Sequence, residues 1–240
     1  MQKRIAIIIP ALNEERSLPM VLGALTGMTM PPTPGGSTLS ISRIVVVDNG
    51  STDATARVAA AAGAEVVSEP KRGYGRGCLT GIAALAGDAP DIVVFLDADF
   101  SDDPSLLPAL AGPIADGAMD FVLGSRILGR AEPGALLPQA RYGNQVSVRL
   151  LNLLYGSRYT DLGPFRAIRY DSLMRLGMRD ESFGWTAEMQ VKAVRAGLRI
   201  AEVPASYRKR VGTSKITGTL SGTIRAGTKI IWTILRYSRS

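Results

Sequence analysis

The chain has 240 residues, of which 46% are hydrophobic, and a formal net charge of +7. This length can bury a substantial core as one large domain or two small ones. The chain has no histidine and a single cysteine, Cys78, so an internal disulfide is excluded and neither a zinc site nor a histidine-based triad is expected. A lone cysteine suits a reducing, cytoplasmic compartment. Any chemistry must therefore use carboxylates, Arg or Lys, hydroxyl groups, or a metal held by oxygen.

The charge is distributed unevenly along the chain. Residues 189–240 hold eleven Lys or Arg and one acid, hence +10, which leaves −3 for residues 1–188. A basic end of this kind is typical of proteins that bind nucleic acid, an anionic membrane or a phosphorylated substrate. No stretch of the sequence approaches the roughly 18 apolar residues of a membrane span.

Segments typical of strands and helices alternate through the first half of the chain. A loop rich in Pro and Gly is expected at 30–37. The alternation predicts an α/β fold, with a mostly parallel central sheet and helices on both faces. Strands are predicted at 5–9, 44–47, 65–68, 92–96 and 121–123, and helices at about 14–25, 54–62, 73–85 and from Asp103-Pro104 onward.

The second half is less regular, with helices predicted at 141–155 and 185–196 and a strand at 201–207. We assign residues 1–215 to one domain and 216–240 to a C-terminal amphipathic, basic helix. Apolar and basic residues mixed with Trp232 suit a helix that lies in a membrane interface. The alternative is a helix packed on the domain, or on the partner in a homodimer.

Acidic residues follow three of the predicted strands. The carboxyl ends of parallel strands share one edge of a sheet, and ligands bind outside that edge, so these acids are expected in one cleft. Two carboxylates one residue apart are costly unless a cation lies between them, and oxygen ligands suit Mg²⁺ or Mn²⁺. Asp48 has an alternative interpretation as the cap of the next helix. The acids are Glu14, Asp48, Asp97 and Asp99.

Four segments taken together resemble the family 2 glycosyltransferases of the GT-A fold: Pro10-Ala-Leu-Asn-Glu14, Val46-Val-Asp48-Asn-Gly-Ser-Thr-Asp53, Leu96-Asp97-Ala-Asp99 and Gly124-Ser-Arg126. Two later segments, Asp161-Leu-Gly-Pro-Phe-Arg166 and Arg210-Val-Gly-Thr-Ser-Lys215, are similar to the dolichyl- or polyprenyl-phosphate sugar transferases within that family. The resemblance implies metal-dependent transfer of a hexose, with inversion, from a nucleotide-sugar such as a UDP- or GDP-hexose. The implied acceptor is a polyprenyl phosphate at the cytoplasmic face of a membrane.

The resemblance also implies roles for individual residues. Arg126 would meet the acceptor, and Asp97 and Asp99 would hold the metal. Arg210 would approach the diphosphate together with Ser214 and Lys215. The residues that would contact the nucleotide-sugar are Pro10, Leu12, Glu14, Asp48, Lys71, Gly73, Asp97, Ala98, Ser214 and Lys215.

The sequence departs from the resembled pattern at two positions. Asn49 stands where many relatives carry a second Asp, which changes the expected polarity of the base pocket. Ser101 stands where the dolichyl-phosphate mannose enzymes often have Gln, which affects the expected coordination of the metal.

The acceptor determines whether a general base is needed. An acceptor phosphate is already anionic and needs no strong base, whereas a hydroxyl acceptor does. Glu188 is the candidate base for that second case; otherwise it is a helix-surface acid near a helix N-terminus.

Two further functions are weighed against glycosyl transfer. A nucleotidyltransferase shares this kind of sheet but usually has a Gly-rich, basic first loop, which 10–14 lacks. Nucleic-acid binding fits the charge, yet only 6% of residues are aromatic and no basic stripe interleaves with them.

Overall fold

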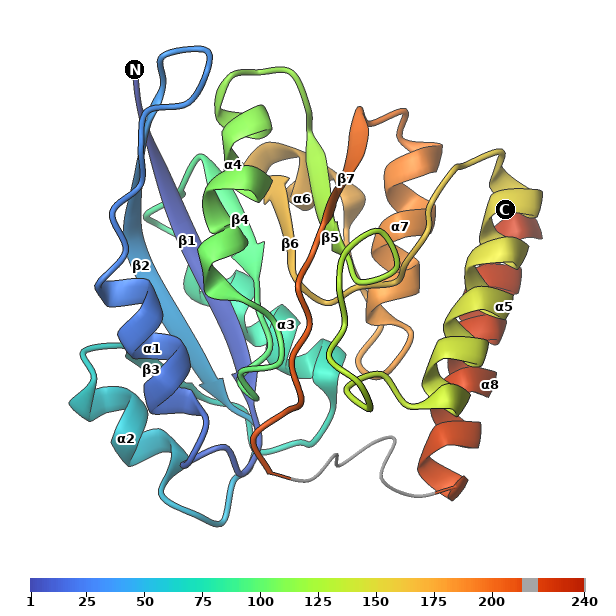
Figure 1. The fold of residues 1–240 in the computed structure, drawn as a ribbon, viewed down its shortest axis with the longest axis horizontal. Helices are drawn as coiled ribbons and strands as arrows, with labels where there is room; N and C mark the ends of the chain where they lie inside the picture. The colour runs from blue at the N-terminus through green and yellow to red at the C-terminus, as the bar shows by residue number, and fades with distance from the viewer. Residues whose placement is uncertain (213–219, 240) are drawn as a thin grey trace.

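The computed structural model describes residues 1–212 and 220–239, and within them a single mixed sheet forms the centre of the molecule (Figure 1). Its strand order is β3-β2-β1-β4-β6-β5-β7, and neighbouring strands are parallel except β6, which is antiparallel to β4 and β5. The predicted α/β fold with a mostly parallel sheet is confirmed. The strands are β1 (Gln2–Ala11), β2 (Thr38–Asp48), β3 (Glu65–Ser68), β4 (Ile92–Phe95), β5 (Phe121–Ser125), β6 (Arg166–Arg169) and β7 (Ile200–Pro204).

Helices cover both faces of this sheet because its central strands are apolar on both sides. In β1, Ile5, Ile7 and Ile9 belong to one core cluster, while Ala6 and Ile8 belong to the other. The first cluster lies under α1 (Leu18–Thr26), α2 (Thr55–Ala61) and α4 (Leu107–Ala115). The second lies under α3 (Tyr74–Ala84), α5 (Pro138–Tyr155), α6 (Tyr170–Leu176), α7 (Trp185–Arg195) and α8 (Leu220–Arg236).

Several element boundaries differ from those expected from sequence. Helix α1 begins at Leu18 rather than near residue 14, because the preceding residues form a loop in which Asn13 adopts a positive φ of 54°. Helix α5 begins earlier than predicted, at Pro138, where the fixed φ of proline suits the first turn. Strand β7 ends at Pro204, and the chain then leaves the sheet. Strand β6 and helix α6 were not predicted, and each is shorter than eight residues.

The strand ends that carry the predicted site lie on one edge of the sheet, as expected. Ala11 of β1 is in register with Asp48 of β2, and Ile8 of β1 with Phe95 of β4. The turns that follow these three strands are therefore neighbours, and the backbone N–H of Asn49 donates to the carbonyl of Ala11 at 2.8 Å.

The last helix packs beside α5 and α7 (Figure 1). The hydroxyl of Tyr155 donates to the carbonyl of Ile234 at 2.5 Å, and Lys229 pairs with the buried Asp180 at 2.8 Å. The domain boundary predicted at residue 215 lies outside the described residues. No helix in the described parts of the chain has the length and apolar character needed to cross a membrane.

Candidate active site

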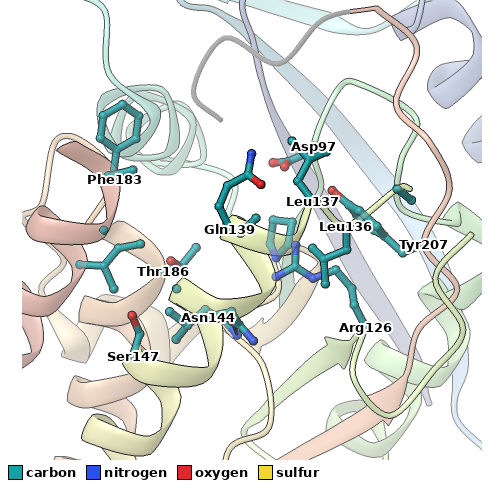
Figure 2. A pocket seen from close by; sticks show the side chains of 18 of the residues that line it. Asp97, Arg126, Leu136, Leu137, Gln139, Asn144, Ser147, Phe183, Thr186 and Tyr207 are labelled. Atoms are coloured by element: carbon teal, nitrogen blue, oxygen red, sulfur yellow. Dashed lines mark hydrogen bonds between the residues drawn. The ribbon is translucent and has the colours of Figure 1, made fainter. Parts of the chain in front are cut away.

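A pocket of about 600 Å³ opens beside the carboxyl end of β4 (Figure 2). One end is charged and contains Asp97, Arg126 and Arg210. The other end extends between α5 and α8, where apolar residues are accompanied by the polar side chains Asn144, Ser147 and Thr186 (Figure 2). Leu136 and Leu137 line the pocket beside Asp97 and Arg126 (Figure 2), and the other apolar residues of the lining include Ala140, Leu162, Phe183, Ala226 and Ile230.

The two predicted metal-binding carboxylates have different surroundings. Asp99 is buried, and its Oδ1 accepts from the backbone N–H of Ser101 at 2.9 Å and from the Ser101 hydroxyl at 2.5 Å. Its Oδ2 pairs with the guanidinium of Arg210. In contrast, Oδ1 of Asp97 is buried without a hydrogen-bond partner among the described residues. Burial and the charge of Asp99 raise the pKa of Asp97 to about 6, against the opposing effect of Arg210.

Asp102 is a third acid at this edge, and it was not among the residues predicted from the sequence. It is 2% exposed, and its Oδ2 has no partner among the described residues. Burial, followed by the charge of Asp97, raises its pKa well above the ordinary value. The sequence feature that could have indicated Asp102 is its position three residues after Asp99.

The carboxylate chemistry of this cluster fits a divalent cation. Buried carboxylate oxygens without donors are stabilised by a cation, and hard oxygen ligands suit Mg²⁺ or Mn²⁺. Within the residues that the structure describes, no three acidic, His or Cys side chains are arranged to hold a metal ion by themselves. A metal held by Asp97 and Asp99 would therefore complete its coordination with oxygens of a ligand or of water.

Arg126 is held rigidly at the charged end of the pocket. Its Nε and Nη2 donate to the two carboxylate oxygens of Asp161 at 2.8 and 2.7 Å, and its guanidinium carbon lies 5.1 Å from the ring centroid of Tyr207. Burial alone would lower the pKa of Arg126, but the pair with Asp161 raises it above the usual range. Arg126 therefore stays protonated and is fixed in orientation at this end of the pocket.

The segment that follows β7 crosses the end of the Asp97–Asp99 loop. The backbone N–H of Arg208 donates to the carbonyl of Ser101 at 2.8 Å, and that of Val211 donates to the carbonyl of Asp99 at 3.0 Å. This path explains how Arg210 reaches Asp99 from a distant part of the sequence. Ser214 and Lys215, predicted to act with Arg210, lie outside the described residues.

Of the predicted nucleotide-contacting residues that the structure describes, Asp97 lines this pocket, and the others gather at the same sheet edge outside it. Asp48 Oδ1 accepts from the backbone N–H of Ser51 at 3.1 Å, which stabilises the turn after β2. The cap-like contact before α2 comes instead from Asp53, which accepts from the N–H of Thr55 at 2.9 Å. The alternative of Asp48 as that helix's cap is therefore wrong. The other members of the predicted set at this edge are Pro10, Leu12, Glu14, Lys71, Gly73 and Ala98.

Asn49 joins the turn after β2 to the loop before α3. Its buried side-chain amide donates to the carbonyls of Glu69 and Lys71 at 3.1 and 2.8 Å, and accepts from the N–H of Gly73 at 2.8 Å. An ionised Asp has no donor for two carbonyls. The departure from Asp at this position therefore has a structural reason.

Glu188, the candidate base, is fully buried and does not line the pocket. Its carboxylate accepts from the N–H groups of Arg179 and Asp180 and from the hydroxyl of Tyr237, and it pairs with Lys192 at 2.7 Å. These donors occupy both oxygens, so the placement contradicts a general base acting on a ligand in this pocket. The structure likewise overturns the interpretation of Glu188 as a helix-surface acid.

Asn144 on α5 is a pocket residue that the sequence did not reveal. It is 8% exposed, and its Oδ1 accepts from the N–H of Leu162 at 2.9 Å, which fixes the orientation of the amide. Its Nδ2 has no partner among the described residues. Figure 2 shows Asn144 and Thr186 on the side of the pocket away from Asp97, whereas the Gln139 side chain extends toward Asp97. A buried, unpaired donor in a pocket is suited to an oxygen of a ligand.

Comparison with known proteins relates this site to sugar transfer. A family profile described as Glycosyl transferase family 2 matches residues 6–177. An uncharacterized glycosyltransferase of Mycobacterium tuberculosis is 40% identical over 224 residues, covering 92% of this chain and 94% of that protein. A dolichyl-phosphate hexose transferase of Haloferax volcanii is 33% identical over 213 residues, covering 88% of this chain and 86% of the relative.

A solved structure extends the similarity to the whole fold. Glucosyl-3-phosphoglycerate synthase from Mycobacterium tuberculosis, in complex with Mn²⁺, UDP-glucose and phosphoglyceric acid, matches with a TM-score of 0.74 at 25% identity, covering 99% of this chain and 80% of that one. The GT-A fold implied by the sequence motifs is thereby confirmed. The motifs, the fold and these relatives agree, and the chain belongs to glycosyl transferase family 2.

Proposed function

We propose that this glycosyltransferase moves a hexose from a UDP- or GDP-sugar to the phosphate of a polyprenyl phosphate, at the inner face of the cytoplasmic membrane. The observation that carries the proposal is the pocket itself, which combines the charged groups Asp97, Arg126 and Arg210 with a lining that is otherwise mainly apolar. An acceptor with an anionic head and a hydrocarbon tail has the same two-part character. The name of the Haloferax volcanii relative supports this acceptor class.

The donor would lie along the carboxyl edge of the sheet. Neighbouring strands are about 4.8 Å apart, so Asp48 and Asp97, at the ends of β2 and β4 with β1 between them, are about 10 Å apart. A nucleoside and its diphosphate span such a distance. We propose that Asp48 contacts the base and that the predicted set Pro10, Leu12, Glu14, Lys71, Gly73 and Ala98 borders the nucleotide.

Asp97 and Asp99 would hold Mg²⁺ or Mn²⁺ against the diphosphate. When bound, the metal supplies positive charge where the leaving nucleoside diphosphate gains negative charge. The unpaired Oδ1 of Asp97 supports this role, as does the Mn²⁺ bound by the related synthase.

The transfer itself needs positioning and charge more than proton transfer. An oxygen of the acceptor phosphate would form the bond to the anomeric carbon as that carbon's bond to the diphosphate oxygen breaks, with inversion. Arg126 would hold the acceptor phosphate, and Arg210 would exchange its contact with Asp99 for the leaving diphosphate. The acceptor is already anionic, so no general base is required.

A second candidate acceptor is a soluble, phosphorylated hydroxyl compound. The related synthase was crystallised with phosphoglyceric acid, and the polar side chains Gln139, Asn144 and Thr186 in this pocket favour a polar ligand. The position of Glu188 weakens this candidate, because the acid predicted as the base for the hydroxyl is buried outside the pocket.

The donor is identified by thermal unfolding with UDP, GDP, CDP or dTDP, each with and without Mn²⁺. A ligand that binds only the native state raises the melting temperature in proportion to its occupancy. We expect a metal-dependent rise with one nucleotide that is lost in Asp99→Asn. No rise with any nucleotide would contradict the donor site.

The acceptor is identified by radiolabel transfer from that donor to undecaprenyl phosphate, undecaprenol and 3-phosphoglycerate in matched detergent. We expect product with undecaprenyl phosphate only. Turnover of 3-phosphoglycerate without turnover of the lipid phosphate would overturn the proposal in favour of the second candidate.

A further inference from the structure

A second concave surface lies outside the candidate active site, between the start of α3, residues 179–182 and the second half of α8. It encloses about 400 Å³. We call it the basic pocket, because cations outnumber acids in its lining. The charged residues are Arg72, Arg76, Arg179, Lys229 and Arg236, against Asp180 and Glu181.

Both acids of the basic pocket already pair with a cation. Arg76 pairs with Glu181 at 2.6 Å, and Lys229 pairs with Asp180 at 2.8 Å. The other three guanidinium groups have no acidic partner among the described residues, so the pocket holds three uncompensated positive charges. These belong to Arg72, Arg179 and Arg236.

The walls of the basic pocket are held together by the buried acid Glu188. It accepts from the N–H groups of Arg179 and Asp180 on one wall, and from the hydroxyl of Tyr237 just beyond α8 on the other. Asp180 adds the pair with Lys229 of α8. Arg179 and Arg236 are therefore carried on two segments whose spacing is fixed before any ligand arrives.

The neighbouring face of α8 exposes three large apolar side chains, with Thr228 between two of them. Ile224, Trp232 and Leu235 are spaced eight and three residues apart, which places them on one side of the helix, and they are 59%, 48% and 45% exposed. Lys229 and Arg236 lie 4.7 and 5.1 Å from the Trp232 ring, so the basic pocket borders this apolar stripe directly. An apolar stripe flanked by cations is the pattern of a helix lying in a lipid interface.

We propose that the basic pocket binds the phosphate headgroup of an anionic phospholipid while the apolar stripe of α8 enters the interface. The proposal rests on the proposed function for placing a membrane beside α8, but the site is separate from the acceptor pocket. A free phosphate would make no use of the apolar stripe. A nucleic acid would need several cation–aromatic sites in a row rather than one closed pocket.

Vesicle sedimentation tests the proposal with phosphatidylcholine alone and with phosphatidylcholine mixed with phosphatidylglycerol. Each basic residue near an anionic surface strengthens binding about fivefold, so R179Q/R236Q should bind the mixed vesicles roughly thirtyfold more weakly than wild type. The matched control R16Q/R57Q removes two exposed arginines near α1 and in α2, at the opposite end of the molecule, and should bind nearly as wild type. Equal losses in both variants would overturn the proposal, because only net charge would then matter.

Trp232 provides a direct signal, because the other tryptophan, Trp185, is fully buried. We expect a blue shift of fluorescence with mixed vesicles, absent with phosphatidylcholine or with inorganic phosphate. A shift of the same size with inorganic phosphate would overturn the lipid assignment, as would tighter binding to single-stranded DNA than to mixed vesicles at the same salt concentration.

Failure of this inference is distinguishable from failure of the proposed function. R179Q/R236Q should turn over a short-chain prenyl phosphate in detergent solution as wild type does, because neither arginine lines the acceptor pocket. Loss of vesicle binding together with retained turnover supports the headgroup site. Retained vesicle binding in R179Q/R236Q overturns it, whichever acceptor the enzyme uses.

Discussion

Hydrogen bonds around single side chains distinguish residues that maintain the fold from residues left open to a ligand. Glu188 is surrounded by donors, and Asn49 satisfies three backbone groups. In contrast, Asp97 and Asn144 each keep a buried polar atom without a partner among the described residues, and both line the pocket. Unpaired buried polar atoms are costly, so such atoms at a pocket point to a ligand that pairs with them.

Glu188→Gln should reduce stability without slowing turnover. Burial tends to raise the pKa of Glu188, but hydrogen bonds from Lys192 and Tyr237 lower it below its ordinary value. Its stabilising effect is therefore present above the unfolded-state pKa and is lost as pH falls through the lower folded-state pKa. We expect the variant to lose about 1–3 kcal/mol at pH 7, and to show a shallower loss of stability in acid, by urea unfolding across pH. A large fall in kcat at unchanged stability would restore Glu188 as the base.

Asn144→Asp should weaken binding of the acceptor phosphate. The change keeps an acceptor for the N–H of Leu162 but replaces the free donor with a negative charge inside the pocket. We expect at least a tenfold rise in KM for the lipid phosphate and a smaller change in KM for the donor, from initial rates. Gln145→Glu adds the same charge one residue away on an exposed position and should have little effect. Equal effects of the two variants would contradict a contact from Asn144.

At the scale of elements, close packing of backbone against backbone fixes the position of helix α3. Helix α3 begins against residues 180–181, with the backbone N–H of Arg76 donating to the carbonyl of Glu181 at 3.1 Å. A Cβ on Gly75 would overlap the carbonyl oxygen of Asp180. The contact brings together the loop before α3, which is part of the predicted donor site, and one wall of the basic pocket.

Gly75→Ala should therefore separate α3 from that segment. We expect a loss of at least about 1–3 kcal/mol by urea unfolding, as for other overpacked buried sites. Gly23→Ala in α1 is the matched control, because its Cβ would meet nothing within 4 Å, and it should be neutral or stabilising by up to about 1 kcal/mol. Equal stability of the two variants would contradict the packing argument.

For the whole molecule, the fold and the candidate metal site depend on different parts of the chain. Two apolar clusters on opposite faces of the sheet hold the domain together, whereas the acidic cluster lies in loops at one edge. Asp99 pairs with the guanidinium of Arg210 and accepts a hydrogen bond from the hydroxyl of Ser101, so its charge is compensated without a metal. The fold should therefore be complete without a cation.

EDTA should leave the melting temperature of the nucleotide-free protein unchanged, within about one degree. With the cognate nucleotide present, EDTA should abolish the ligand-induced rise, and Mn²⁺ or Mg²⁺ should restore it. Scanning fluorimetry with and without EDTA measures both effects. A fall in the melting temperature of the nucleotide-free protein in EDTA would show that the metal is a structural part of the fold.

The sequence by itself determined the α/β class, most strand positions and the edge at which the acids meet. Those features follow from local patterns, since apolar runs predict buried strands and parallel strands share their carboxyl edge. The family was indicated by the resemblance of four segments in order along the chain, residues 10–14, 46–53, 96–99 and 124–126. Short elements such as β6 and α6 escaped prediction because seven or fewer residues carry too little periodicity.

Only the tertiary structure decided which polar groups are free to act. Glu188 and Asn144 are both polar residues on helices, and nothing in their local sequence separates a fully bonded acid from an amide with an open donor. Long-range packing made that difference, because the N–H of Leu162 fixed the Asn144 amide while Tyr237 and the 179–180 backbone enclosed Glu188. Packing of α8 on α5 and α7 likewise places residues of α8 in both the candidate active-site pocket and the basic pocket. The sequence could not predict this, because the segments that pack against α8 lie far from it along the chain.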